Sequence, residues 1–264
     1  MNKFSHSSTS FSFFNAVALG QAALIAYEAE PTIAAAVDKW GMNNFRFITQ
    51  KETQCFVAGD DKKIIVSFRG TEPNKLKDWA TDAGIFLGPG PFGSVHQGFL
   101  GALLDVWPAV RDTLREFQDQ AQSLWFTGHS LGAALATLAV TELRKNARPV
   151  YGLYTFGQPR VGDSEFERMF NMDFKSMCFR YANNNDVVTR VPLRTMGYRH
   201  VGNCLYFDHK GILRSDISYW WKFLDSVAGR VDDLGKLGPD AIKDHSMKTY
   251  LKLLRKNQDR KVSL

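Results

Sequence analysis

The hydrophobic pattern of the chain switches repeatedly between short apolar runs and longer stretches with apolar residues at helical spacing. The short runs, rich in β-branched and aromatic residues, predict strands at Phe45–Thr49, Gln54–Ala58, Lys63–Phe68, Ser123–Phe126, Val150–Phe156 and Met177–Ala182, with a further strand over residues 198–207. Helical spacing predicts helices over residues 99–121, 131–146 and 241–256, and a helix-forming stretch at 15–27 that ends before Pro31.

This alternation of strand and helix is typical of an α/β fold with a mostly parallel central sheet covered by helices on both faces. A length of 264 residues suits a single domain over residues 1–264. Active sites in such sheets lie at the C-terminal ends of the strands, so reactive side chains are expected directly after each predicted strand.

Composition narrows the class of protein. Hydrophobic residues make up 44% of the chain and charged residues 23%, which excludes a disordered, collagen-like or coiled-coil protein. The cysteines Cys55, Cys178 and Cys204 are widely spaced, so a disulfide framework and a four-cysteine zinc site are excluded and reduced thiols are expected. The N-terminal residues lack the charged region of a secretory signal, and no apolar run is long enough to span a membrane. We therefore expect a cytoplasmic protein.

The formal net charge of +6 is concentrated near the C-terminus. Residues 210–264 contain 12 Lys and Arg against 7 Asp and Glu, and they are expected to form a basic helical segment. Such a segment attracts the phosphates of a nucleic acid or of an anionic membrane. A solvated basic helix without any partner also explains the pattern.

A serine nucleophile is predicted at position 130. The sequence Gly128-His-Ser-Leu-Gly132 follows a predicted strand and opens a predicted helix, which is the context of the G-x-S-x-G elbow of serine hydrolases. The flanking glycines allow backbones to approach closely, and the helix N-terminus favours negative charge that develops at Ser130. The alternative is a serine that merely caps the helix after a glycine turn.

Two donors for an oxyanion are expected near this serine. The backbone N–H of Leu131 is the first, since it follows the nucleophile. Thr71 is the second, because it lies in the turn after the predicted strand Lys63–Phe68. An ordinary turn built around Gly70 is the alternative.

The segment of residues 72–93 is expected to cover the site as a lid. It is rich in glycine and apolar residues, and its candidate substrate-facing side chains are Trp79, Ile85, Phe86 and Leu87. A packed surface loop is the alternative. The G-x-G-x-x-G pattern over residues 88–93 does not predict a nucleotide site, because its two prolines remove N–H donors that a pyrophosphate needs.

The acid and the base are predicted downstream of the serine. Asp186 follows the predicted strand Met177–Ala182, where a carboxylate can orient an imidazole. His245 comes after this acid, at the start of the last predicted helix, and is the candidate base, while His129 is expected to point away from the chemistry. An aspartate in a polar turn and a histidine that caps a helix are the alternatives for Asp186 and His245.

These motifs together resemble the class 3 (fungal-type) lipases of the α/β-hydrolase superfamily, over about residues 16–254. The landmarks are Phe68-Arg-Gly-Thr71, Val95-His-Gln-Gly-Phe99, Gly128-His-Ser-Leu-Gly132, Thr155-Phe-Gly-Gln-Pro-Arg-Val-Gly-Asp163, Asn185-Asp-Val-Val188 with Val191-Pro192, Tyr198-Arg-His-Val-Gly202 and Asp244-His245 with Tyr250.

The resemblance implies a triad of Ser130, Asp186 and His245, with oxyanion donors at Thr71 and Leu131 and a helical lid near residues 72–83. It implies no metal and no cofactor for the chemistry. The segment of residues 217–239 departs from the fungal pattern and suggests a bacterial member.

The expected function is therefore hydrolysis of lipid esters. A soluble esterase for short-chain or aromatic esters is one alternative, and a degenerate hydrolase fold that binds a membrane or nucleic acid is another. A lipid or ester substrate is expected, together with peripheral contact to a lipid surface through Trp220 and Trp221, and no nucleic acid. The sequence does not indicate an oligomeric state.

Overall fold

The computed structural model describes residues 3–72, 86–118, 121–144, 149–184, 186–215 and 243–260. Most of its strands form one eight-stranded sheet: β1 (Asn44–Gln50), β2 (Thr53–Gly59), β3 (Lys63–Phe68), β6 (Ser123–His129), β7 (Val150–Phe156), β8 (Cys178–Asn183), β9 (Asn203–Phe207) and β10 (Leu213–Arg214). The strand order is β1-β2-β3-β6-β7-β8-β9-β10.

The centre of this sheet is parallel and its two ends are antiparallel. Strands β3, β6, β7, β8 and β9 pair in parallel, whereas β1 and β2 at one end and β10 at the other pair antiparallel to their neighbours. The predicted mostly parallel central sheet is confirmed. Strand β6 extends to His129 because Gly128 and His129 still pair with Thr155 and Phe156 of β7. The strand expected over 198–207 is shorter, since it begins only at Asn203.

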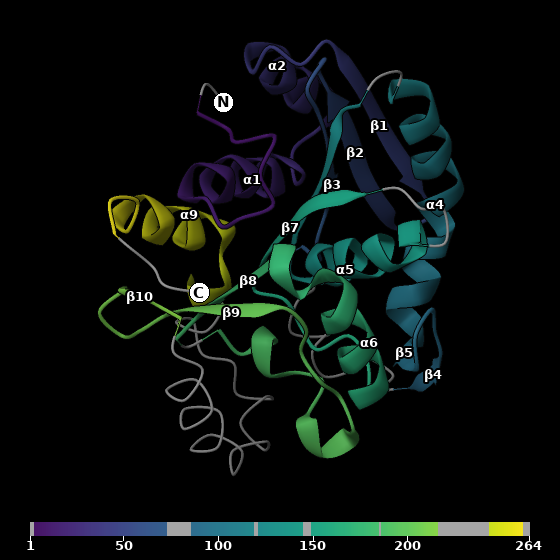
Figure 1. The fold of residues 1–264 in the computed structure, drawn as a ribbon, viewed down its shortest axis with the longest axis vertical. Helices are drawn as coiled ribbons and strands as arrows, with labels where there is room; N and C mark the ends of the chain where they lie inside the picture. The colour runs from purple at the N-terminus through teal and green to yellow at the C-terminus, as the bar shows by residue number, and fades with distance from the viewer. Residues whose placement is uncertain are drawn as a thin grey trace.

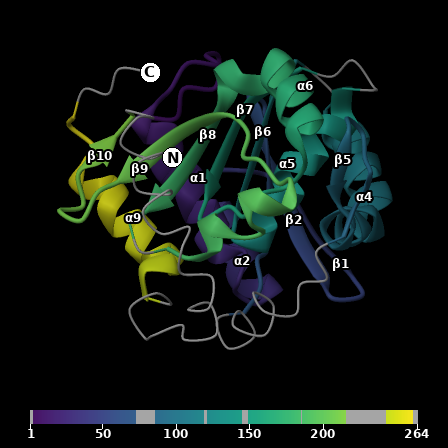
Figure 2. The ribbon, with the colours of Figure 1, turned by 90° about the horizontal axis from the view of Figure 1, so that it is seen from below.

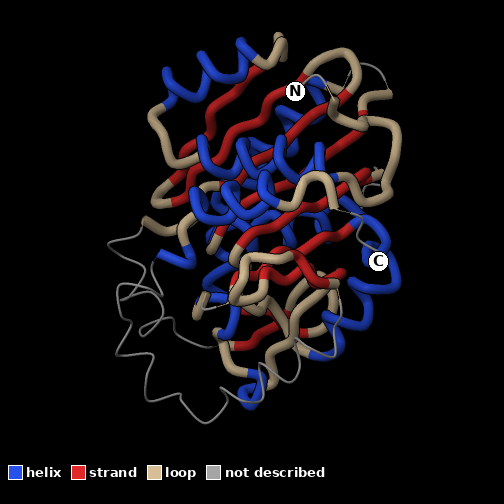
Figure 3. The backbone as a smooth tube through the Cα atoms, turned by 90° about the vertical axis from the view of Figure 1, so that its left-hand side faces the viewer, coloured by secondary structure: helices blue, strands red, loops and turns tan. Residues whose placement is uncertain are grey.

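Helices cover both faces of the sheet. They are α1 (Phe13–Ile25), α2 (Glu30–Lys39), α4 (Gln97–Phe117), α5 (Leu131–Arg144), α6 (Ser164–Phe174) and α9 (Met247–Lys256). Helices α1 and α9 lie on one face, and α4, α5 and α6 lie on the other (Figures 1 and 2). Each face has its own apolar core, so the sheet is buried on both sides. Figure 3 shows the strands running side by side through the molecule with helices over them.

Two helices and one hairpin were not anticipated from the sequence. The sequence predicts only that the first helix ends before Pro31, whereas Pro31 also stands in the first turn of α2, where a missing N–H costs nothing. Helix α6 is capped by the side chain of Asp163, which accepts the N–H of Phe166. The end of the expected cover over 72–93 forms β4 (Leu87–Pro89) and the turn of a two-stranded hairpin, which β5 (Ser94–His96) completes.

The N-terminal residues lie against the sheet. The side chain of Ser12 caps α1, its N–H donates to the hydroxyl of Tyr154 at 3.1 Å, and the ring of Phe4 packs edge-on against Trp125 at 4.8 Å. Among the described residues, no helix combines the length and the apolar character that crossing a membrane requires.

The parallel strands bring four chain segments to one edge of the sheet. The turns after β3, β6, β7 and β8 begin at Arg69, Ser130, Gly157 and Asn184, and all leave the sheet at its C-terminal edge. This is the edge at which α/β proteins hold their active sites.

Candidate active site

Ser130 lies in a tight turn between β6 and α5. Its φ of 58° falls in the left-handed region, which a residue with a side chain adopts at a cost of ~1–3 kcal/mol. The turn is held by a hydrogen bond from the Ser130 N–H to the Phe156 carbonyl at 3.0 Å. A Cβ at Gly128 would come within 2.2 Å of the Gly132 carbonyl oxygen, so only glycine fits there. The expected strand-to-helix turn is therefore present, and it presents a buried serine.

The chain after β3 passes directly beside this turn. A Cβ at Gly70 would lie 2.3 Å from the His129 carbonyl oxygen and 3.1 Å from the Ser130 Cβ. Thr71 follows Gly70 and Leu131 follows Ser130, so both residues expected to supply oxyanion donors lie next to the serine. Backbone amides placed in this way can stabilise an oxygen that becomes negative during acyl transfer.

Asp186 follows β8, is fully buried and holds the ring of His245. The Nδ1 of His245 lies 2.9 Å from each carboxylate oxygen. The N–H of Val188 and the hydroxyl of Tyr250 donate to the same carboxylate at 3.0 and 2.5 Å. Because a carboxylate only accepts hydrogen bonds, Nδ1 carries the proton and Nε2 of the neutral ring keeps its lone pair.

The chain at the end of β7 lies beside both the serine and the histidine. The Phe156 carbonyl accepts the N–H of Ser130, and a Cβ at Gly157 would lie 2.9 Å from Nδ1 of His245. Within the described part of the chain, the Ser130 Oγ and the His245 Nε2 are buried and have no hydrogen-bond partner. In serine hydrolases the hydrogen bond between the catalytic serine and histidine is often long without substrate and shortens when substrate binds.

The expectation that His129 points away from these groups is wrong. Its ring lies 4.4 Å from the ring of His245, and its Nε2 lies 2.5 Å from the His245 carbonyl oxygen. Its Nδ1 lies 2.8 Å from the hydroxyl of Tyr27. Alternation along a strand fails at this position because β6 ends at His129 and the chain turns sharply at Ser130.

Two further residues of the site were not assigned a role from the sequence. The hydroxyl of Tyr250 also accepts the N–H of Asn183 at 2.9 Å, and burial together with the nearby Asp186 raises the pKa of Tyr250 well above its usual range. Gly157 has a φ of 58° and leaves no space for a side chain beside Asp186 and His245. Two features of the sequence point to these roles: Tyr250 lies in the predicted helix that contains His245, and Gly157 directly follows a predicted strand.

The three cysteines do not offer a competing nucleophile. All are free and buried, as expected for reduced thiols. Burial raises the pKa of Cys178 to about 12, so its thiol stays protonated near neutral pH. A protonated thiol is a poor nucleophile.

The structure describes only two of the four expected lid residues, Phe86 and Leu87. Trp79 and Ile85 lie outside the described residues, as do Trp220 and Trp221. The side chain of Phe86 is 68% exposed, and Leu87 begins β4 and is partly buried.

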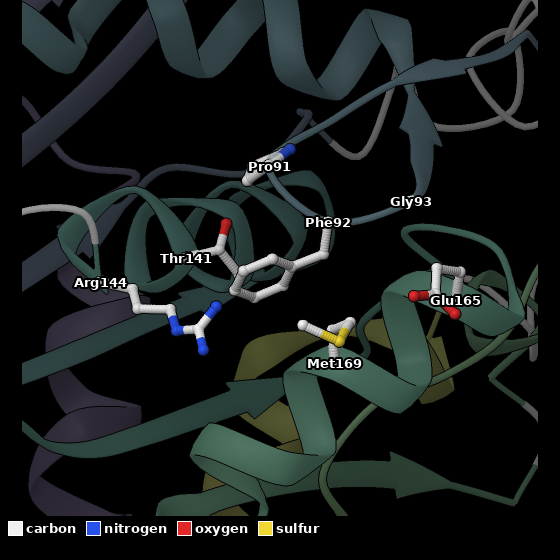
Figure 4. A pocket seen from close by; sticks show the side chains of 7 residues that line it. All are labelled: Pro91, Phe92, Gly93, Thr141, Arg144, Glu165 and Met169. Atoms are coloured by element: carbon white, nitrogen blue, oxygen red, sulfur yellow. The ribbon is translucent and has the colours of Figure 1, made fainter.

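A separate hollow of about 510 Å³ opens between the β4–β5 hairpin and helices α5 and α6. The side chains of Phe92, Arg144 and Met169 face it from these three elements (Figure 4). The guanidinium of Arg144 lies 5.0 Å from the centre of the Phe92 ring and pairs with Asp173 at 2.8 Å. The hollow is not lined by Ser130, Asp186, His245 or either expected oxyanion donor, so it is not the pocket around the catalytic groups.

Comparison with known families assigns the chain to one of them. The sequence model of the family described as lipase (class 3) matches residues 65–196, which is half of the chain. The chain belongs to the class 3 lipase family.

Individual relatives of this class 3 lipase come from plants and fungi. Triacylglycerol lipase OBL1 of Arabidopsis thaliana is 33% identical over 71% of this chain and 48% of its own length. Secreted mono- and diacylglycerol lipase A of Penicillium cyclopium is 34% identical over 60% of this chain and 53% of its own length. The chain thus spans about half the length of the curated relatives it matches.

The fold is shared with solved fungal lipases. The crystal structure of the lipase from Rhizopus microsporus var. chinensis superposes with a TM-score of 0.61 at 26% identity, covering 77% of this chain and 78% of that one. The expected α/β-hydrolase fold of this class 3 lipase is confirmed. The plant and fungal relatives give no support to a bacterial origin, and the Penicillium protein is named as secreted, which gives no support to a cytoplasmic location.

Proposed function

We propose that this class 3 lipase hydrolyses carboxylic esters of lipids through an acyl-enzyme formed on Ser130. The observation that carries the proposal is the buried pair of Asp186 and His245, with Nε2 of His245 unengaged at the sheet edge where Ser130 turns out of β6. The relatives named as triacylglycerol lipase and as mono- and diacylglycerol lipase support lipid esters as the substrate class.

The proposed reaction has two halves, formation of the acyl-enzyme and its hydrolysis, and His245 is the base in both. The Ser130 Oγ attacks the ester carbonyl while Nε2 of His245 takes its proton, and the same imidazolium then protonates the leaving alcohol. Asp186 stabilises the imidazolium through the Nδ1 hydrogen bond. The N–H groups of Thr71 and Leu131 stabilise the oxyanion, and a water activated by His245 releases the acid.

We assign residues 72–93 to a lid and residues 1–264 to one α/β-hydrolase domain with a basic C-terminal segment over 210–264. The exposed ring of Phe86 supports contact of the lid region with lipid, since a large apolar side chain in water favours an apolar partner. Phe86 and Leu87, together with Trp79 and Ile85 outside the described residues, are the proposed substrate contacts of this lid. Turnover of a poorly soluble ester should rise above its solubility limit, whereas simple saturation below that limit would instead indicate a soluble esterase.

Replacement of the nucleophile tests the proposal. Ser130→Ala should reduce turnover of p-nitrophenyl esters to background, because no acyl-enzyme can form. Ser67→Ala is the matched control, since Ser67 is another fully buried serine whose Oγ has no partner in the described residues, and this variant should keep its activity. Retained turnover in Ser130→Ala would rule out the proposed mechanism.

A further inference from the structure

We propose that Tyr27 and His129 are positioning residues that tie the turn at Gly70 to the main chain of His245. The inference rests on the proposed function, because it concerns how the base and an oxyanion donor are held in place. Neither side chain touches the reacting atoms, and both act through the residues that do.

One end of this connection is the backbone of the base. The Nε2 of His129 lies 2.5 Å from the His245 carbonyl oxygen, and the two rings lie 4.4 Å apart with a tilt of 37°. A carbonyl only accepts, so the proton of His129 is on Nε2. Burial lowers the pKa of His129 well below its usual range, and the nearby His245 lowers it further. The ring is therefore neutral, with one donor and one acceptor.

The direction of the next hydrogen bond follows from this assignment. With the proton on Nε2, Nδ1 of His129 is an acceptor, and the hydroxyl of Tyr27 donates to it at 2.8 Å. His129 is only 4% exposed, so loss of the Tyr27 hydroxyl would leave a buried acceptor without a partner. The hydroxyl thus fixes the tautomer that His129 needs in order to hold His245.

The other end is the turn that carries the expected oxyanion donor. A Cβ at Gly70 would lie 2.2 Å from the Tyr27 hydroxyl, so this hydroxyl rests directly on the Gly70 backbone. The guanidinium of Arg69 lies 5.9 Å from the centre of the Tyr27 ring. Thr71 is the next residue, so displacement of Tyr27 would move the donor as well as the base.

A neutral His129 also suits the charge that forms during the reaction. When His245 becomes an imidazolium, a second positive ring at 4.4 Å would oppose it, whereas a neutral ring does not. The buried position of His129 therefore supports both the geometry and the charge of the base.

Three variants test the connection. His129→Gln keeps an N–H that reaches the His245 carbonyl, whereas His129→Leu removes it, and Tyr27→Phe removes the hydroxyl. Loss of a buried hydrogen-bond partner should lower kcat roughly 10- to 100-fold in His129→Leu and Tyr27→Phe, and His129→Gln should stay within about 5-fold of the parent. KM for a soluble short-chain p-nitrophenyl ester should stay within about 3-fold in all three, since none of these groups binds the substrate.

Tyr154→Phe is the matched control, because Tyr154 is also buried and its hydroxyl accepts the N–H of Ser12 away from Ser130. It should leave kcat unchanged. Equal kcat losses in His129→Gln and His129→Leu, or an unchanged kcat in Tyr27→Phe, would overturn the proposal. If His129→Leu does not fold, the comparison of kcat between Tyr27→Phe and Tyr154→Phe tests the proposal. An inactive parent protein would instead reject the proposed function.

Discussion

Single side chains at the sheet edge determine whether the site can work. The buried carboxylate of Asp186 has three hydrogen-bonding partners, His245, Val188 and Tyr250. Charge-assisted hydrogen bonds of this kind are about twice as strong as neutral ones. This arrangement fixes the ring of His245, and Gly157 supplies the space in which the ring and the carboxylate meet.

Gly157 therefore gives a direct test at the scale of one residue. Gly157→Ala would place a Cβ 2.9 Å from the Asp186 Oδ2 and from Nδ1 of His245, and its φ of 58° is unfavourable for alanine. A displacement of this size should lower kcat about 100-fold. Steady-state kinetics with a soluble ester measures the effect.

The control for this variant is Gly101→Ala in α4, where a Cβ meets no atom within 4 Å. Alanine at a helical position should leave kcat unchanged and raise the unfolding free energy by up to about 1 kcal/mol. Equal activity in the two variants would show that the space at Gly157 is not needed.

At the scale of elements, the sequence predicts the strands of the central sheet better than the helices and hairpins that connect them. Strands β3 and β7 match the predicted bounds, because both are mostly apolar runs that are buried along almost their whole length. The sequence does not predict helix α2 or the β4–β5 hairpin, since Pro31 is taken as the limit of the first helix and the glycine-rich segment 72–93 as a lid.

The candidate site was predictable where chemistry follows directly after a strand. Ser130 and Asp186 fit this rule, and each lies at the sheet edge. The contacts of His129, Tyr27 and Gly157 were not predictable, because they join segments that are far apart in sequence and depend on the sharp turn at Ser130.

At the scale of the whole molecule, buried histidines make stability depend on pH. Burial lowers the pKa of His129 and of His200 well below the usual range, helped by His245 in the first case and by Arg180 and Arg160 in the second. The unfolded chain then binds protons that the folded chain does not, so stability is lost as the pH falls below the unfolded value of about 6.5.

The free energy of unfolding is therefore expected to fall between about pH 6.5 and pH 5, by up to about 1.4 kcal/mol per pH unit for each such histidine. Urea unfolding across this range measures the slope. His200→Gln keeps a donor for the Thr189 carbonyl, which accepts from Nε2 of His200 at 2.7 Å, and should show a shallower slope. A slope that this substitution does not change would contradict a neutral His200.

The most direct measurement of the central claim is covalent labelling with a fluorophosphonate, followed by mass spectrometry of the digested protein. The account predicts one adduct, on the peptide that contains Ser130, and a labelling rate that falls to background in His245→Gln, because only a serine activated by that imidazole reacts. An adduct at another residue, no adduct, or undiminished labelling in His245→Gln would contradict it.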